Sequence, residues 1–309
     1  MNLVRKVFVT ATLCICTAAL ANAQDSAGNL CSELAGTPHT LPSPEAVEGA
    51  TASYIFKSVG ETRLRIHVFK PSAGATVPLP AVIFFFGGGW MTGNVSAFAP
   101  QARYVAARGA TAILADYRTF CRNGVEVDAQ VADAADAVRW VRAHAQDLGI
   151  NPERIAVSGG SSGGHLALTT AVFRQRDAAG TDSLPNLLVL FYPCVDLTSD
   201  AEQEFSGKAI AGHGKRLSPL FHVRPGLPPT YVFQGTADPL YGEVRKYCEK
   251  ARDAGNKCDM TEYAEAGHGF FNVASPARGK WYDAALDAMG VVLTREGWLA
   301  APEHAAISD

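Results

Sequence analysis

A serine flanked by glycines lies where a predicted strand meets a predicted helix. Residues 159–165 read GGSSGGH, directly after the strand-like run at 154–158. A serine on such a tight turn adopts strained backbone geometry and projects its hydroxyl above the sheet, and glycines beside it avoid collisions across the turn. The helix N-terminus behind it offers N–H groups to a developing oxyanion. The pattern therefore predicts a nucleophilic serine.

This serine motif fits the chain in two registers. Residues 159–163 centre G-x-S-x-G on Ser161, and residues 160–164 centre it on Ser162. Spacing alone does not choose between them. A phosphate loop would require Lys and then Ser or Thr after its glycines, and a dinucleotide-binding turn would require G-x-G-x-x-G. Neither pattern is present here, so the segment favours a nucleophile.

A second glycine-rich segment, FGGGW at residues 86–90, follows an apolar strand-like run. Three glycines leave the backbone bare, so its N–H groups can approach a substrate oxygen to about 3 Å, the distance that oxyanion stabilisation requires. We expect the N–H groups of Gly87 and Gly88, together with that of Ser162, to bind an oxyanion. The alternative is a simple glycine turn between a strand and a helix.

An acid and a base follow the serine in the order that a Ser-Asp-His triad needs. Asp238 comes at the end of a predicted strand, where side chains of parallel strands point into the ligand crevice. His268 lies between Gly267 and Gly269 on a predicted loop. A histidine there would take the serine proton, and an aspartate would fix the tautomer of its ring. The alternatives are a turn-capping aspartate and a solvated loop histidine.

Strand-like and helix-like runs alternate along the chain, which is typical of a parallel sheet with helices on both faces. The strand-like runs lie at residues 62–69, 81–86, 111–116, 154–158, 187–192, 230–234 and 259–263, and the helix-like runs at 127–146, 166–174, 241–254 and 281–294. The fold class predicted from this alternation is α/β with a mostly parallel central sheet.

The serine segment GGSSGGHLA resembles the GGSAGGHLA or GDSAGG elbow of α/β-hydrolase serine esterases, in the hormone-sensitive-lipase-like and bacterial feruloyl and acetyl esterase branch. The resemblance covers residues 53–298 and implies an α/β-hydrolase fold with Ser161 as nucleophile. The short chain between Pro193 and Pro229 indicates a small cap on this fold. It also implies hydrolysis of short-acyl esters, with acetyl or feruloyl groups on small molecules or carbohydrate, without metal or cofactor. Phe86 departs from this family, which usually has His at that position.

Aromatic residues near the predicted motifs are candidates for the walls of the substrate pocket. We expect Trp90, Tyr192 and Phe270 in this role. The segment between Pro193 and Pro229 is too short for a large lid, which favours an open site. Two other functions remain open: a peptidase or amidase with the same triad, and an inactive binding protein on the same fold.

The composition suits one large enzyme domain. Of 309 residues, 48% are hydrophobic and 18% are charged, which permits a sizeable core. A formal net charge of −3 and the absence of basic runs give no reason to expect nucleic acid or an anionic membrane as partner. The oligomeric state is left open.

The N-terminus has the pattern of a secretory leader. Arg5 and Lys6 precede the apolar residues 7–20, and the small residues of Ala21-Asn22-Ala23 suit a signal peptidase. We expect a signal peptide at 1–23, a linker or N-terminal arm at 24–52, a catalytic domain at 53–298 and a tail at 299–309. The protein would then be secreted or periplasmic, with no stable membrane anchor. The alternative is a leader that stays in place as an anchor.

Removal of the leader would leave an odd number of cysteines. These are Cys31, Cys121, Cys194, Cys248 and Cys258. Cys248 and Cys258 form the best local candidate pair, and a looser option joins Cys31 to Cys121. None lies in a C-x-x-C pair, which disfavours zinc.

Overall fold

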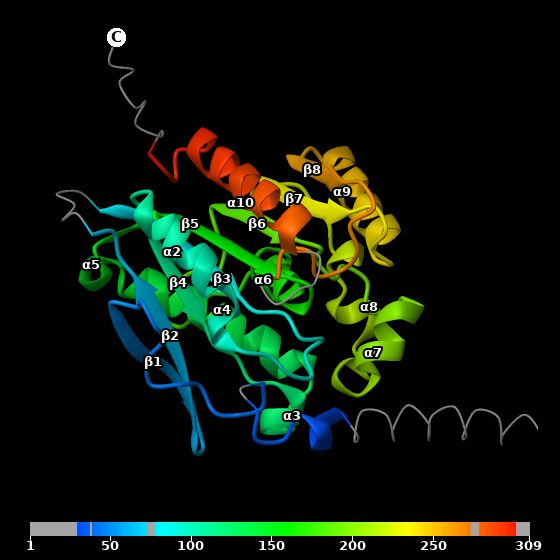
Figure 1. Cartoon of the computed structure of the whole chain (residues 1–309), viewed down its shortest axis with the longest axis horizontal. Coiled ribbons are helices and arrows are strands. Elements are labelled where there is room, and N and C mark those ends of the chain that lie inside the picture. The colour runs from blue at the N-terminus through cyan, green and yellow to red at the C-terminus, as the bar shows by residue number, and fades with distance from the viewer. Residues whose placement is uncertain (1–29, 38, 73–77, 273–277, 301–309) are drawn as a thin grey trace, which may run out of the picture.

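The computed structural model describes residues 30–37, 39–72, 78–272 and 278–300 (Figure 1). The predicted signal peptide at 1–23 lies outside these residues, as do the first part of the arm and residues 301–309 of the tail. Among the residues that the structure describes, no helix is both long and apolar enough to span a bilayer.

The centre of the fold is an eight-stranded sheet with the order β1-β2-β4-β3-β5-β6-β7-β8. The strands are β1 (Ala52–Val59), β2 (Thr62–Phe69), β3 (Leu79–Phe85), β4 (Thr111–Ala115), β5 (Ile150–Gly160), β6 (Leu187–Phe191), β7 (Thr230–Gly235) and β8 (Cys258–Tyr263). β2 pairs with β1 and β4 in the antiparallel sense, and all other neighbours are parallel. The expected mostly parallel α/β-hydrolase sheet is therefore present.

Helices cover both faces of this sheet (Figure 1). They are α2 (Ala99–Ala107), α3 (Phe120–Asn123), α4 (Val127–Ala143), α5 (Ala145–Leu148), α6 (Ser162–Val172), α7 (Asp200–Ile210), α8 (Gly214–Leu217), α9 (Tyr241–Asp253) and α10 (Arg278–Arg295), with the 3₁₀ turns η1 (Val95–Phe98) and η2 (Pro219–Phe221). α2 lies against α10, and α4 packs on α6. Because both faces are covered, β3 and β6 are continuously apolar, and nearly all of their residues are buried.

Several helix boundaries differ from the sequence prediction, and two of the differences bear on the packing. The run at 127–146 is divided at His144, where the backbone leaves helical geometry between α4 and α5. The helix predicted at 166–174 begins earlier, at Ser162. Gly163 and Gly164 disfavour a helix by propensity, but tertiary packing overrides this preference.

The strand register brings the functional segments to one edge of the sheet. Phe85 pairs with Gly159, and Phe191 pairs with both Gly160 and Phe233. β3, β5, β6 and β7 therefore end side by side, and the loops that follow them meet there. This is where ligands bind in open α/β sheets.

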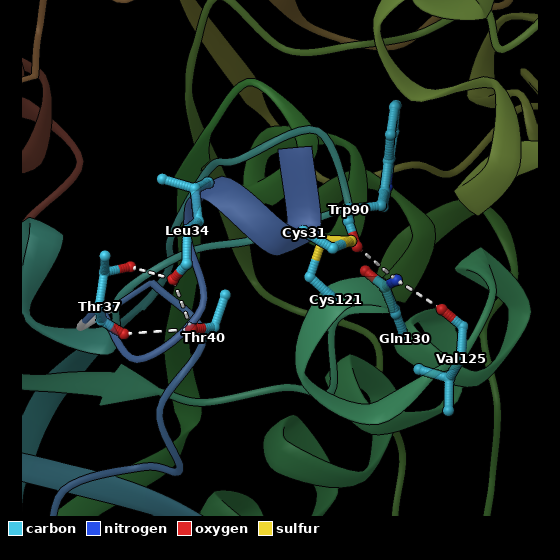
Figure 2. Close-up of a disulfide and its surroundings, with 8 residues drawn as sticks. All are labelled: Cys31, Leu34, Thr37, Thr40, Trp90, Cys121, Val125 and Gln130. Carbon is cyan, nitrogen blue, oxygen red and sulfur yellow. Dashed lines mark hydrogen bonds between the residues drawn. A yellow bond between two sulfur atoms is a disulfide. The ribbon is translucent and has the colours of Figure 1, made fainter. Parts of the chain in front are cut away.

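The residues before β1 are attached to the body of the fold. A disulfide joins Cys31 to Cys121, as Figure 2 shows. The N–H of Gly93 donates to the carbonyl of His39 at 3.2 Å, and Val47 belongs to the core. A second disulfide joins Cys248 to Cys258, and Cys194 is free and buried. Both cysteine pairs suggested by the sequence are thus present.

Candidate active site

Ser161 occupies a strained turn between β5 and α6. Its φ of 55° lies in the left-handed region that residues other than glycine rarely adopt. A Cβ atom at Gly159 would lie 2.5 Å from the carbonyl oxygen of Gly163, and one at Gly163 would lie 2.2 Å from that of Phe85. The turn can therefore form only with glycine at both positions, which is the physical reason for the G-x-S-x-G spacing.

Ser161, His268 and Asp238 form a continuous hydrogen-bonded chain. The Oγ of Ser161 is 2.9 Å from Nε2 of His268, and Nδ1 of His268 is 2.9 Å from Oδ2 of Asp238. The hydroxyl of Ser162 is buried, and the two ring nitrogens of His268 bond Ser161 and Asp238 instead. The geometry thus brings Ser161, and not Ser162, to the imidazole.

The carboxylate of Asp238 is fixed on both of its oxygens. The side-chain amide of Gln234 donates to Oδ2 at 2.9 Å, and the N–H of Leu240 donates to Oδ1 at 2.9 Å. The side chain of Asp238 is fully buried, whereas that of His268 is 36% exposed. A buried, doubly held carboxylate can keep the imidazole in one orientation while the ring still reaches the cavity.

The glycines after β3 lie beside the serine. A Cβ atom at Gly87 would lie 3.3 Å from the Cβ of Ser161, and one at Gly88, where φ is +144°, would lie 2.2 Å from the carbonyl oxygen of Thr92. Within the described part of the chain, the N–H groups of Gly87, Gly88 and Ser162 donate no hydrogen bond to a protein acceptor. These N–H groups are available to a developing oxyanion.

A cavity of about 1050 Å³ opens over these groups. Ser161, Asp238, His268, Gly87 and Gly88 all line it. Its volume lies just above the usual range for small-molecule sites, about 300–1000 Å³. The cavity therefore leaves room for a group considerably larger than an acetyl ester on at least one side of the serine.

Only one of the three expected aromatic walls lines this cavity. Tyr192 does, and its ring meets that of His268 edge-on at 4.9 Å. The expectation for Trp90 is wrong, because its fully buried indole turns inward and donates to Nδ1 of His165 at 3.2 Å. The expectation for Phe270 is also wrong, because its ring packs against Tyr263, and Phe271 lines the cavity instead.

Several residues that line the cavity carry no signal in the sequence. The segment before β1 contributes His39, Pro44, Ala46, Val47 and Glu48, and the first turn of α7 contributes Ala201 and Glu202. The first segment has no apolar period, so pattern reasoning assigns it no place. The suggested pairing of Cys31 with Cys121 was the one indication that it lies close to the body.

A buried thiol lies next to the serine. Sγ of Cys194 is 3.8 Å from Oγ of Ser161. Burial, together with the nearby carboxyl of Glu202, raises the pKa of the Cys194 thiol well above its ordinary value. Because thiolate is the reactive form of cysteine, this thiol is not a rival nucleophile near neutral pH.

One group of metal-ligating types is present among the described residues. Glu126, Asp128 and His213 lie with their ligand atoms within 4.8 Å of one another, and both acids are exposed. The guanidinium of Arg216 contacts the ring of His213. A cation already at this ring disfavours a metal ion, and none of these residues lines the cavity.

Comparison with known proteins agrees with this geometry. A family model described as BD-FAE matches residues 66–244. The chain is 29% identical over 264 residues to carboxylesterase NlhH of Mycobacterium tuberculosis, covering 77% of this chain and 79% of the relative. It is similar to Thermogutta terrifontis esterase 2 phosphonylated by sarin, with a TM-score of 0.77, 35% identity, and coverage of 84% of this chain and 100% of the other. The propionate-bound form of that esterase gives a TM-score of 0.73 at 36% identity, and the match covers 82% of this chain and 97% of the other.

Proposed function

We propose a mechanism for this chain, which belongs to the BD-FAE family and is a carboxylic ester hydrolase. It cleaves esters through an acyl-enzyme formed on Ser161. The single observation that carries this proposal is the position of His268, 2.9 Å from the serine hydroxyl and 2.9 Å from the carboxylate of Asp238. A serine hydroxyl is a weak nucleophile near neutral pH unless a neighbouring base removes its proton.

In the acylation half of the reaction, Oγ of Ser161 attacks the ester carbonyl while Nε2 of His268 takes the serine proton. The N–H groups of Gly87, Gly88 and Ser162 stabilise the oxyanion of the tetrahedral intermediate. The intermediate collapses when the ester C–O bond breaks and His268 returns the proton to the leaving alcohol. Asp238 stabilises the imidazolium that exists between these steps.

In deacylation, His268 removes a proton from water, which attacks the acyl carbonyl held on Ser161. The same N–H groups stabilise the second oxyanion. Collapse releases the carboxylic acid and returns the proton from His268 to the serine oxygen. Labelling with a fluorophosphonate, followed by mass mapping, tests this scheme: the adduct is expected on Ser161, and an adduct on Ser162 or on no serine contradicts it.

The proposed substrates are short-acyl esters, including acetyl or feruloyl groups on carbohydrate. A solved structure of the similar Thermogutta terrifontis esterase 2 holds propionate and another holds butyrate, which supports a short acyl group. A series of nitrophenyl esters from acetyl to decanoyl tests this, together with acetylated sugars and feruloyl esters. We expect the highest kcat/KM at two to four acyl carbons, about tenfold or more above decanoyl; a maximum at decanoyl contradicts the proposal.

We also propose export, with the leader at residues 1–23 removed and residues 53–298 forming the catalytic domain. Two disulfides support an oxidising compartment, because reduced thiols prevail in the cytosol. Expression of the full chain in a secreting host, followed by intact-mass measurement, is expected to give a mature protein that begins at Gln24. A cell-associated product that retains Met1 contradicts export.

A further inference from the structure

The oxyanion loop of this chain begins with a side chain that can donate no hydrogen bond. Phe86 is fully buried, and its ring stacks on that of Tyr117 with centroids 4.1 Å apart and planes inclined by 13°. A Cβ atom at Gly93 would lie 2.1 Å from the Phe86 ring, so the far end of the loop closes over the same ring. The ring is held between Tyr117 and the end of the loop.

Tyr117 also makes a polar contact with this loop. Its hydroxyl donates to the carbonyl oxygen of Phe86 at 2.8 Å. That carbonyl and the N–H of Gly87 belong to one planar peptide unit, in which C=O and N–H point in opposite directions. A donor that holds the carbonyl on the buried side therefore directs the N–H of Gly87 towards the other side, where Gly87 lines the cavity next to Ser161.

We propose that Tyr117 is a positioning residue for ester hydrolysis, whose hydroxyl fixes the Phe86–Gly87 peptide and so aims the N–H of Gly87 at the oxyanion. This inference rests on the proposed function, because Gly87 acts only if an oxyanion forms at Ser161. A hydrogen bond to the carbonyl also polarises the peptide and strengthens its N–H as a donor.

The surroundings of Tyr117 suit a permanent donor. The residue is fully buried, and burial raises the pKa of its hydroxyl, which therefore stays protonated at the working pH of an esterase. The backbone carbonyl of Tyr117 accepts from Arg122, whose guanidinium pairs with the buried Asp116 at 2.9 Å. Tyr117 is thus anchored independently of the loop that it contacts.

The residues after Tyr117 run along the rest of the same loop. The N–H of Phe120 donates to the carbonyl of Trp90 at 3.0 Å, and that of Cys121 donates to Met91 at 2.8 Å. The amide of Gln130 donates to the same Trp90 carbonyl at 2.9 Å, as Figure 2 shows. These bonds hold the far part of the loop, at Trp90 and Met91. The hydroxyl of Tyr117 holds its near part, at the Phe86–Gly87 peptide.

The test is Tyr117→Phe, which keeps the stacked ring and removes only the hydroxyl. Its matched control is Tyr231→Phe, which removes a buried tyrosine's bond to Glu296, 2.5 Å long and remote from the cavity. Steady-state kinetics with nitrophenyl acetate give kcat and KM, with kcat expressed per serine titrated by a fluorophosphonate. Unfolded protein therefore does not lower kcat.

We expect Tyr117→Phe to lower kcat about tenfold or more, a part of the hundredfold to thousandfold that loss of a whole oxyanion donor costs. KM should change less than about threefold, and Tyr231→Phe should keep kcat within about twofold. A kcat for Tyr117→Phe within twofold of wild type, or an equal loss in both variants, overturns the inference. Activity that survives in Ser161→Ala overturns the proposed function instead.

A second variant covers the case in which Tyr117→Phe yields no titratable enzyme. Phe86→Leu keeps the hydroxyl of Tyr117 but removes the ring that aligns the loop with it. A fall in kcat of about threefold or more at unchanged KM supports the inference, and an unchanged kcat overturns it.

Discussion

At the residue scale, the site depends on a backbone conformation that is costly for serine. A φ of 55° places Oγ of Ser161 at the cavity, whereas the neighbouring Ser162 begins a helix and is buried. Backbone strain of this kind costs about 1–3 kcal/mol and persists only where the surrounding structure imposes it. Here the backbone packs so closely against Gly159 and Gly163 that neither position has room for a Cβ atom, and this packing holds the turn.

Ser161→Ala is expected to lower kcat about a thousandfold or more, because it removes the hydroxyl that we propose forms the acyl-enzyme. The melting temperature should change little, since alanine fits wherever serine fits. Kinetics with nitrophenyl acetate and a thermal melt measure both. Ser162→Ala keeps the hydroxyl of Ser161, so its kcat should fall far less. A larger fall in kcat for Ser162→Ala than for Ser161→Ala would show that the nucleophile is misassigned.

A half-buried carboxyl, that of Glu243, gives a prediction about pH and stability. Burial, and then the charges of Glu202 and Asp196, raise the pKa of Glu243 to about 8. The pKa of Glu243 is higher in the folded protein than in the unfolded chain, so the folded protein holds this proton to a higher pH. The stability of the folded state therefore falls as pH rises from about 4.5 to about 8.

Glu243→Gln mimics the protonated form at every pH. We therefore expect it to raise the melting temperature by several degrees at pH 8.5 and by little at pH 5, where the wild-type group is already neutral. Differential scanning calorimetry at both pH values measures this. Glu249→Gln, on the same helix and paired with Arg245 at an exposed site, is the control and should show no such pH-dependent gain.

At the element scale, the segment before β1 is a wall of the site. Five of its residues line the cavity, namely His39, Pro44, Ala46, Val47 and Glu48. The disulfide from Cys31 to Cys121 attaches the segment beside the oxyanion loop (Figure 2). The disulfide Cys248–Cys258 joins α9 to β8, and neither cysteine lines the cavity. Removing each disulfide in turn therefore distinguishes an effect on substrate binding from an effect on the stability of the fold.

Cys31→Ser with Cys121→Ser is expected to raise KM about threefold or more, because a wall of the site becomes free to move. Cys248→Ser with Cys258→Ser should leave KM nearly unchanged. Sequence separations of 90 and 10 residues correspond to stabilisation of about 4–5 and about 3 kcal/mol, so both double variants should melt at lower temperature. Equal KM values in the two variants would contradict the role of the segment as a wall.

At the scale of the whole molecule, the parallel strands and the helices between them place residues from distant parts of the chain at one edge of the sheet. Along the chain, 77 residues separate Ser161 from Asp238 and 30 separate Asp238 from His268. In space, His268 is hydrogen-bonded to both of the others. The cavity above them is lined by residues from distant parts of the chain, including the segment before β1 and α7.

The size of this cavity predicts tolerance of bulky alcohols. We expect kcat/KM for an acetylated disaccharide to lie within about tenfold of that for a simple alkyl acetate such as ethyl acetate, since a cavity of about 1050 Å³ can enclose the larger group. Release of acetate, followed by a coupled assay, measures both substrates. A preference of more than a hundredfold for the small alcohol would show that the cavity does not receive the sugar.

The sequence by itself determined the α/β class, the three residues that converge and the glycine loop beside them. These features follow from local rules: glycine at positions where a Cβ atom would collide, apolar runs for buried strands, and the order serine, aspartate, histidine. The two disulfide pairings were also within its reach, although as open options.

Only the tertiary structure decided the walls of the cavity and the support of the oxyanion loop. Of the adjacent Phe270 and Phe271, the first packs against Tyr263 and the second lines the cavity. The contact of Tyr117 with Phe86 joins residues 31 positions apart on different strand ends. Such contacts depend on how elements pack against one another, and no periodicity in the chain encodes them.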